Sequence, residues 1–184
     1  MTLSELLKKI IRGGAPFALL YVALIPFINW SYGAVPTLPM PDGGAWPPMS
    51  IVAGLVLVVR DFAQREIKHY IWVALAIAAA LSFVTSPAVI AIASTVAFII
   101  SETIDWALFT FSKKPLSYRV MLSSLISAPI DTTAFWYLAS LSQEGVFRPY
   151  TIATAIVSKL LGAYVVYLIL KRREAAGEDT VGDL

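Results

Sequence analysis

Apolar residues gather in six long stretches along the chain, and short polar gaps separate them. The stretches cover residues 13–32, 49–69, 70–86, 87–111, 120–141 and 150–170. A helix needs about 20 residues to cross a hydrocarbon core of about 30 Å, and the stretches are close to that length. The pattern therefore predicts an all-α integral membrane protein, folded as a compact bundle of six transmembrane helices.

Positive charges mark every second gap between these stretches. Twelve of the 14 Lys and Arg residues follow this rule: Lys8, Lys9, Arg12, Arg60, Arg65, Lys68, Lys113, Lys114, Arg119, Lys171, Arg172 and Arg173. Cytoplasmic loops carry such an excess, so both termini are predicted to be cytoplasmic. Residues 60–66 make the second stretch partly polar. A re-entrant segment there would put residues 113–119 outside, so we keep it as a span.

The composition agrees with a membrane protein and excludes several other classes. The chain is 58% hydrophobic and 14% charged, whereas a soluble domain is about 25% charged. The net charge of +2 comes from the cytoplasmic anchors and does not indicate a nucleic-acid partner. Cysteine is absent, His69 is the single histidine, and no metalloprotease, serine-hydrolase or Walker motif occurs. We therefore predict no enzymatic activity, cofactor or metal site.

Three regions and one unusual loop follow from the same pattern. Residues 1–12 are predicted to be an amphipathic cytoplasmic N-terminus, residues 13–170 the transmembrane domain, and residues 171–184 a disordered cytoplasmic tail. The segment 31–48 is rich in Pro and Gly, which indicates an irregular outer loop. Such a loop could serve as a lid over an outward-facing site.

Ionisable residues inside the predicted spans are the main candidates for function, because each one costs several kcal/mol unless it is paired or solvated. Depth along the spans suggests that Arg60 pairs with Glu102 and that Lys159 pairs with Asp131. Asp61 and Arg65 lie one helical turn apart and are predicted to pair. Asp105 and Glu66 would then be surplus carboxylates. The alternative is that these groups only hold the bundle together.

Aromatic and amide side chains near these charges suggest a substrate site. A carboxylate accepts hydrogen bonds from the N–H groups of a flat heterocycle while an aromatic ring stacks on its face. Amides and cations can donate to its carbonyl group. The predicted substrate-binding residues are Glu102, Asp105, Asp131, Arg60, Gln64, Lys159, Asn29, Trp106 and Phe135.

Three sequence strings resemble a known transporter family. They are Arg60-Asp61-Phe62-Ala63-Gln64-Arg65-Glu66, Ser101-Glu102-Thr103-Ile104-Asp105-Trp106 and the run from Ser123 to Asp131. These strings are similar to those of the VUT family of vitamin-uptake, or queuosine-precursor, transporters, and the resemblance covers about residues 51–170. It implies uptake of 7-cyano-7-deazaguanine or its aminomethyl relative. In size and number of spans the chain also resembles the substrate-binding subunits of energy-coupling-factor transporters.

The leading hypothesis is therefore a multi-pass carrier of the bacterial inner membrane for a purine-like solute. Transport could be proton-coupled or a facilitated diffusion. The alternative is a membrane subunit that binds a vitamin-like solute and needs an energising partner, for which Gly14 and Ala18 offer a small-residue docking face. A homodimer is also open, as is an intramembrane enzyme, which the missing motifs disfavour.

Overall fold

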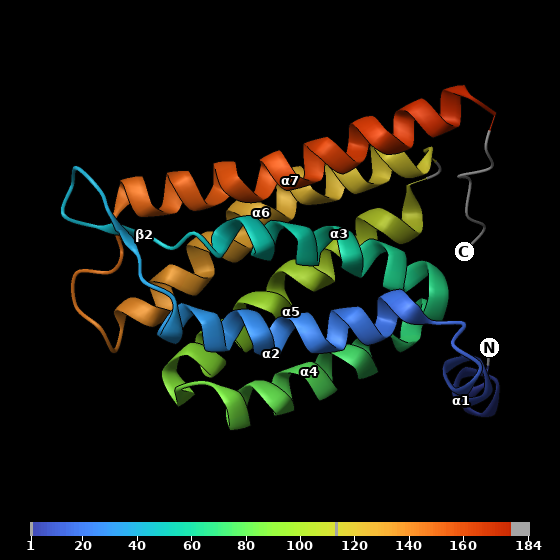
Figure 1. Cartoon of the computed structure of the whole chain (residues 1–184), viewed down its shortest axis with the longest axis horizontal. Helices are drawn as coiled ribbons and strands as arrows, with labels where there is room; N and C mark the ends of the chain where they lie inside the picture. The colour runs from blue at the N-terminus through green and yellow to red at the C-terminus, as the bar shows by residue number, and fades with distance from the viewer. Residues whose placement is uncertain (1, 113, 178–184) are drawn as a thin grey trace.

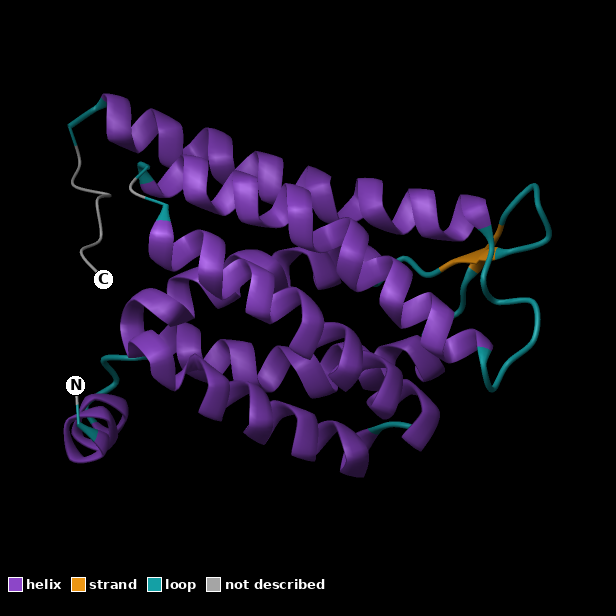
Figure 2. Ribbon diagram, turned by 180° about the vertical axis from the view of Figure 1, so that it is seen from behind, coloured by secondary structure: helices purple, strands orange, loops and turns teal. Residues whose placement is uncertain are grey.

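The structure is a computed structural model that describes residues 2–112 and 114–177. Within these ranges the chain forms seven α-helices, one short 3₁₀ helix and a two-stranded hairpin (Figures 1 and 2). In chain order the elements are α1 (Leu3–Ile11), α2 (Pro16–Ala34), β1 (Leu38–Pro39), β2 (Ala45–Trp46), α3 (Ser50–Ile67), η1 (Lys68–Tyr70), α4 (Ile71–Thr85), α5 (Ala88–Phe111), α6 (Leu116–Ser140) and α7 (Pro149–Ala175).

The six long helices α2 to α7 correspond one to one to the predicted apolar stretches. The largest differences are at α6, which begins at Leu116 rather than at residue 120, and at α7, which ends at Ala175 rather than at residue 170. Both differences lie on polar sequence. An apolar window marks only the part of a helix that suits hydrocarbon, whereas backbone hydrogen bonding continues into more polar surroundings.

Length and hydropathy support a membrane location for four segments of the described chain. They are Pro16–Ala34, Ser50–Thr85, Ala88–Leu108 and Pro149–Ala175, and the second contains both α3 and α4. Helix α6 is not among them, because its serines, Arg119 and Asp131 lower its mean hydropathy. Composition thus supports an all-α protein with several membrane-spanning helices.

The helices form a closed ring in which sequence neighbours are not always spatial neighbours. The order around the ring is α2, α3, α7, α6, α5 and α4, and the α4–α5 contact that closes it is the smallest of these. Helix α1 and the last turn of α7 lie at one end of the bundle, and the hairpin lies at the other (Figure 1). We call these the α1 end and the hairpin end.

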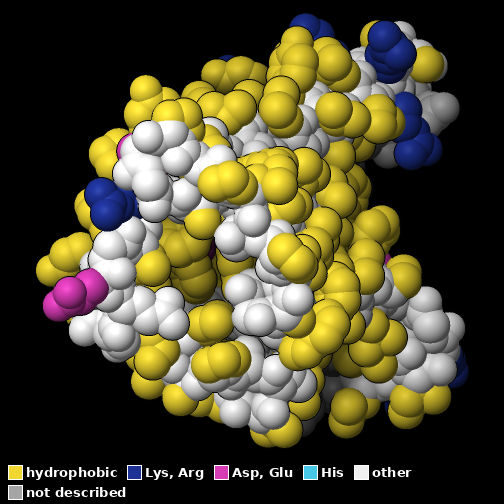
Figure 3. Space-filling model, turned by 60° about the vertical axis from the view of Figure 1, so that its left-hand side comes forward, with side chains coloured by type: hydrophobic (Ala, Val, Ile, Leu, Met, Phe, Trp, Pro, Cys, Tyr) yellow, Lys and Arg dark blue, Asp and Glu magenta, His cyan; other side chains and the backbone are white. Residues whose placement is uncertain are grey.

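The distribution of polarity is the reverse of that in a soluble bundle. Charged side chains are inside: Arg60 and Asp61 are 0% exposed, and Asp131 and Lys159 are 4% and 5% exposed. Large apolar side chains are outside, among them Leu20, Phe27, Val73, Ile77, Ile99, Leu125, Leu161 and Val165. Figure 3 shows hydrophobic side chains over much of one face. A surface this apolar suits lipid rather than water.

Helix α1 is a separate amphipathic element at the α1 end. A capping box between Thr2 and Glu5 begins it, and the hydrogen bond from the Thr2 backbone N–H is the main cause of a lowered pKa of the Glu5 carboxyl. Leu7 and Ile11 are exposed, and Lys9 Nζ donates to the Glu66 carbonyl of α3 over 2.7 Å. Exposed apolar residues beside lysines suit a helix at a membrane surface.

Two expectations about the chain ends change with the structure. Helix α7 includes residues 171–175, and its Glu174 accepts hydrogen bonds from both the backbone and the hydroxyl of Ser117, so this part of the predicted tail is helical. Residues 178–184 lie outside the described chain. The predicted docking face of Gly14 and Ala18 does not form on one helix, because Gly14 precedes the start of α2 at Pro16 and Ala18 is buried.

The Pro-rich loop is attached to the start of α7. Its strands pair antiparallel, with Leu38 opposite Trp46. Asp42 Oδ2 accepts from the Tyr150 backbone N–H, and Thr151 Oγ1 accepts from the Ala45 backbone N–H. Farther along α7, Trp46 Nε1 donates to Ser158 Oγ. These contacts fix the hairpin to one helix of the bundle.

A glycine allows α3 and α7 to cross at very short distance. A Cβ atom on Gly54 would lie 2.5 Å from the Lys159 Cα and 2.8 Å from the Lys159 carbonyl oxygen. Small residues permit such close backbone approach between membrane helices. The two helices cross at Lys159, whose ammonium group is buried in the bundle. Gly54 therefore also determines the position of Lys159.

We expect Gly54→Ala to force the two backbones apart and to destabilise the protein by about 1 to 3 kcal/mol or more. Thermal unfolding of the detergent-purified protein measures this. The matched control is Gly162→Ala in the same interface, where the new Cβ would meet a Leu55 methyl at 3.6 Å, an ordinary contact. Equal melting temperatures for the two variants would show that the close crossing is unimportant.

Candidate functional site

One group of buried charges lies toward the α1 end, between α2, α3, α5 and α6. We call Tyr21, Arg60, Asp61, Glu102 and Asp105 the inner charge cluster. Arg60 Nε donates to Glu102 Oε2 over 2.6 Å, and Arg60 Nη1 donates to Asp61 Oδ1 over 2.9 Å. Tyr21 donates its hydroxyl to Glu102 Oε1 over 2.9 Å. The predicted pair of Arg60 with Glu102 is therefore confirmed.

The predicted pair of Asp61 with Arg65 is wrong. Asp61 accepts from Arg60, its neighbour in sequence, and from Ser123 Oγ of α6 over 3.0 Å. Asp61 faces the bundle interior with 0% exposure, whereas Arg65 is partly exposed. A spacing of four residues puts two side chains on the same side of a helix. Contacts with the neighbouring helices then decide with which group each side chain pairs.

The two predicted surplus carboxylates have different roles. Glu66 is not surplus, because it accepts from the Ala18 backbone N–H over 2.9 Å and so caps the start of α2. Asp105 is 1% exposed and accepts from the Ser127 hydroxyl with one oxygen. Its other oxygen, Oδ2, is buried with no hydrogen-bond partner. The structure thus agrees with the prediction for Asp105 only.

A second buried charge pair lies nearer the hairpin end. Lys159 of α7 donates to Asp131 of α6, as predicted, and both side chains are about 6% exposed. Asn29 of α2 is 2% exposed, and its amide donates to Ser82 of α4. Asn29, Asp131 and Lys159 line a small cavity together with Tyr32, Ser94, Phe135 and four apolar residues. The cavity volume of about 20 Å³ suffices for roughly one water.

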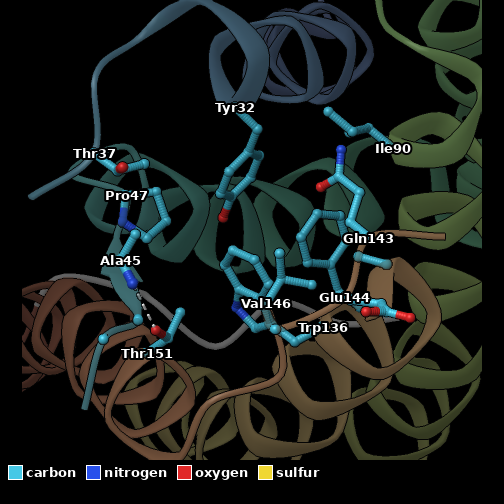
Figure 4. A pocket seen from close by; sticks show the side chains of 15 residues that line it. Tyr32, Thr37, Ala45, Pro47, Ile90, Trp136, Gln143, Glu144, Val146 and Thr151 are labelled. Carbon is cyan, nitrogen blue, oxygen red and sulfur yellow. Dashed lines mark hydrogen bonds between the residues drawn. The ribbon is translucent and has the colours of Figure 1, made fainter. Parts of the chain in front are cut away.

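A larger cavity lies toward the hairpin end, on the other side of two aromatic rings. Its volume is about 300 Å³, at the lower end of the range for small-molecule sites. Figure 4 shows the side chains that line it. Tyr32 comes from α2, Trp136 from α6, and Ala45 and Pro47 from the hairpin and the residue after it. The loop after α6 adds Gln143, Glu144 and Val146. We call it the outer cavity.

Tyr32 and Phe135 line both cavities and separate them. Their ring centroids are 5.2 Å apart, and the Phe135 ring meets that of Trp136 edge-on at 5.3 Å. We call Tyr32 and Phe135 the aromatic partition. A heterocycle in the outer cavity would contact aromatic faces, but it would reach Asp131 only if the partition moved.

The structure divides the predicted site residues into separate places. Asn29, Asp131, Phe135 and Lys159 lie together at the small cavity, whereas Arg60, Glu102 and Asp105 belong to the inner charge cluster. Two predicted residues lie with neither. Gln64 donates to Thr110, and Trp106 donates its indole N–H to His69 Nδ1.

The expected stacking role of Trp106 beside Asp105 does not fit this arrangement. Consecutive helical residues point about 100° apart, so Trp106 faces Trp72 and Phe111 while Asp105 faces Ser127. Conversely, the predicted site residues do not include Tyr32, Trp136, Gln143, Glu144 and Thr151 of the outer cavity. Their signal is weak, because loop residues show no periodicity and interfacial aromatics resemble lipid anchors.

No group of three or more His, Asp or Glu side chains in the described parts of the chain is placed to hold a metal ion. The buried polar side chains offer carboxylates, the Lys159 ammonium group, the Arg60 and Arg119 guanidinium groups, amides and hydroxyls, and aromatic rings lie beside them. Such a set can recognise a polar planar molecule by hydrogen bonds and stacking.

Comparison with known proteins gives one family. Residues 48–171 match the family described as "Putative vitamin uptake transporter". The chain belongs to this family. The match runs from just before α3 to the last turn of α7, so it includes the buried ion pairs of both charge groups. It does not include α2, which carries Tyr21, or the hairpin. Searches of curated proteins and of solved structures gave no match. Membership in the vitamin uptake transporter family confirms the resemblance found in the sequence.

The buried pair at the small cavity leads to a stability prediction. Lys159→Met should leave the Asp131 carboxylate without its cation and destabilise the protein by about 3 to 5 kcal/mol. The double variant Asp131→Asn/Lys159→Met removes both charges and should recover most of that loss. Thermal melts in detergent compare the two. A double variant as unstable as the single one would mean that the damage comes from lost packing of the Lys159 stem.

Proposed function

We propose that this protein is a transporter that imports a small purine-like solute across the bacterial inner membrane, most specifically 7-cyano-7-deazaguanine or its aminomethyl relative. Membership in the vitamin uptake transporter family supports the transport of a vitamin-like molecule. The observation that carries the substrate class is the outer cavity, whose aromatic walls lie directly above a buried carboxylate and ammonium pair.

We propose six spans, α2 to α7, with the α1 end in the cytoplasm. An even number of spans agrees with α1 and the end of α7 lying at the same end of the bundle (Figure 1). Lys8, Lys9, Lys68 and Lys171 all lie at helix ends on that side, as the positive-inside rule requires. The hairpin end then faces the periplasm, and the outer cavity opens there.

The lining of the outer cavity fits the chemistry of a deazaguanine. Such a ring has two flat faces, which suit Tyr32, Phe135 and Trp136. It also presents N–H and amino donors side by side, which one carboxylate can accept together. Glu144 offers a carboxylate at the cavity wall, and Asp131 offers one below the aromatic partition. The ring carbonyl could accept from the Lys159 ammonium group.

Size suggests two steps in binding. The outer cavity admits a small heterocycle, whereas the 20 Å³ cavity beside Asp131 does not. We propose that the solute first stacks in the outer cavity, and that the aromatic partition must then open before the solute reaches Asp131 and Lys159. The Pro-rich hairpin, first proposed as a lid, acts as a wall of this cavity through Ala45 and Pro47.

Ligand binding to the purified protein tests the substrate class. At about 100 times its dissociation constant, 7-cyano-7-deazaguanine should stabilise the protein by roughly 2.7 kcal/mol in a thermal-shift assay. Guanine, riboflavin and pyridoxal serve as comparison ligands. Stabilisation by riboflavin or pyridoxal but by neither deazaguanine would keep the transporter and exclude the proposed substrate.

Neighbouring aromatic residues of α6 provide a matched pair of variants for the site. Phe135→Leu removes a ring of the partition and should weaken binding at least severalfold, because base–aromatic stacking contributes about 1 to 3 kcal/mol. Tyr137→Leu changes a ring that is 55% exposed on the outer face, and it should bind as the unmodified protein does. Equal affinities for the two variants would place the site elsewhere.

A further inference from the structure

The inner charge cluster contains more carboxylates than its cations can balance. Asp61, Glu102 and Asp105 are all buried, and Arg60 directs its guanidinium to the first two and to the Glu102 backbone carbonyl. Arg119 of α6 interacts electrostatically with Asp61. Arg60 and Arg119 thus face three buried carboxylates, so one negative charge of the cluster remains in excess.

The surroundings of Asp105 identify it as the group with spare binding capacity. The charges that act on it are Arg60 and Asp61 from α3 and Glu102 from its own helix, and Tyr21 from α2 interacts with it as well. From α6 it meets the Ser127 hydroxyl, which donates to Oδ1. Oδ2 has no donor, although its side chain is almost fully buried.

A buried carboxylate oxygen without a donor is costly, and one bound proton lowers the cost because it makes the side chain neutral. The Asp105 carboxyl also contacts α6 and interacts electrostatically with α2 and α3. Its charge therefore bears on the relative positions of four helices of the ring. Gaining or losing a proton there changes the electrostatic balance that holds these helices together.

We propose that Asp105 is the proton-binding site that couples solute import to the proton gradient. This inference rests on the proposed transport function. In our mechanism Asp105 binds a proton in the conformation open to the periplasm and releases it to the cytoplasm in the conformation open inward. The outer cavity and the small cavity beneath it are lined by other residues, so the solute and the proton occupy different sites.

The test uses the purified full-length protein in liposomes with radiolabelled 7-cyano-7-deazaguanine. A pH gradient, acidic outside, should drive accumulation of the solute above its equilibrium level in the unmodified protein. Asp105→Asn should reduce this accumulation at least tenfold. The variant should still exchange external for internal solute at equal pH. Exchange needs the solute site but no net proton movement.

Thr103→Val is the matched control on the same helix. Thr103 is exposed on the outer face and bonds only its own helix, through the Ile99 carbonyl, so this variant should accumulate solute normally. Accumulation by Asp105→Asn at the control level would overturn the proposal, and so would accumulation driven by a sodium gradient at equal pH. Absence of exchange in the unmodified protein would instead refute the proposed transport function.

A second variant keeps the proposal testable if Asp105→Asn does not fold. Ser127→Ala removes the hydroxyl that donates to the charged form of Asp105, so the proton should bind more tightly. The pH at which uptake is half-maximal should therefore move upward, by roughly one unit. Ser140→Ala, at the C-terminal end of α6, should leave the profile unchanged, because the Ser140 hydroxyl donates only to the Tyr137 carbonyl of its own helix. An unchanged profile for Ser127→Ala would overturn the role of Asp105.

Discussion

An ionisable side chain inside an apolar envelope must find its partner within the protein, and the arrangement of this bundle depends on that constraint. Arg60 ties α3 to α5 through Glu102, and Tyr21 adds α2 to the same group. Asp61 reaches α6 through Ser123. Nearer the hairpin end, Lys159 ties α7 to α6 through Asp131. Five of the six long helices are thus connected by buried charges or their hydrogen bonds.

The two charge groups differ in what remains for a ligand. At the small cavity the charges of Asp131 and Lys159 match, and open space lies just beyond the aromatic partition. In the inner charge cluster the charges do not match, and a buried oxygen of Asp105 lacks a donor. The first arrangement suits a neutral solute that offers both donors and acceptors. The second suits a proton, so in the proposed mechanism recognition and coupling lie at different depths.

Helix α7 connects the cavity wall to the buried cation. The hairpin is bonded to Tyr150, Thr151 and Ser158 of this helix, and Lys159 follows directly. Gly54 lets α3 cross α7 at the same place. Any displacement of α7 therefore carries the wall of the outer cavity and the Lys159 ammonium group together, which links access to the cavity with the geometry of the ion pair.

The sequence by itself determined the helices, because an apolar run of about 20 residues has few alternatives to a buried or lipid-facing helix. It also determined two charge pairs, since Arg60 with Glu102 and Lys159 with Asp131 could be matched by depth alone. Tertiary structure decided the ring order, which no periodicity encodes. It also paired Asp61 with Arg60 rather than Arg65, turned Trp106 away from Asp105, and brought Glu144 and Trp136 to the outer cavity. Helical spacing fixes only the direction of a side chain, whereas its partner depends on which neighbouring helix packs against that direction.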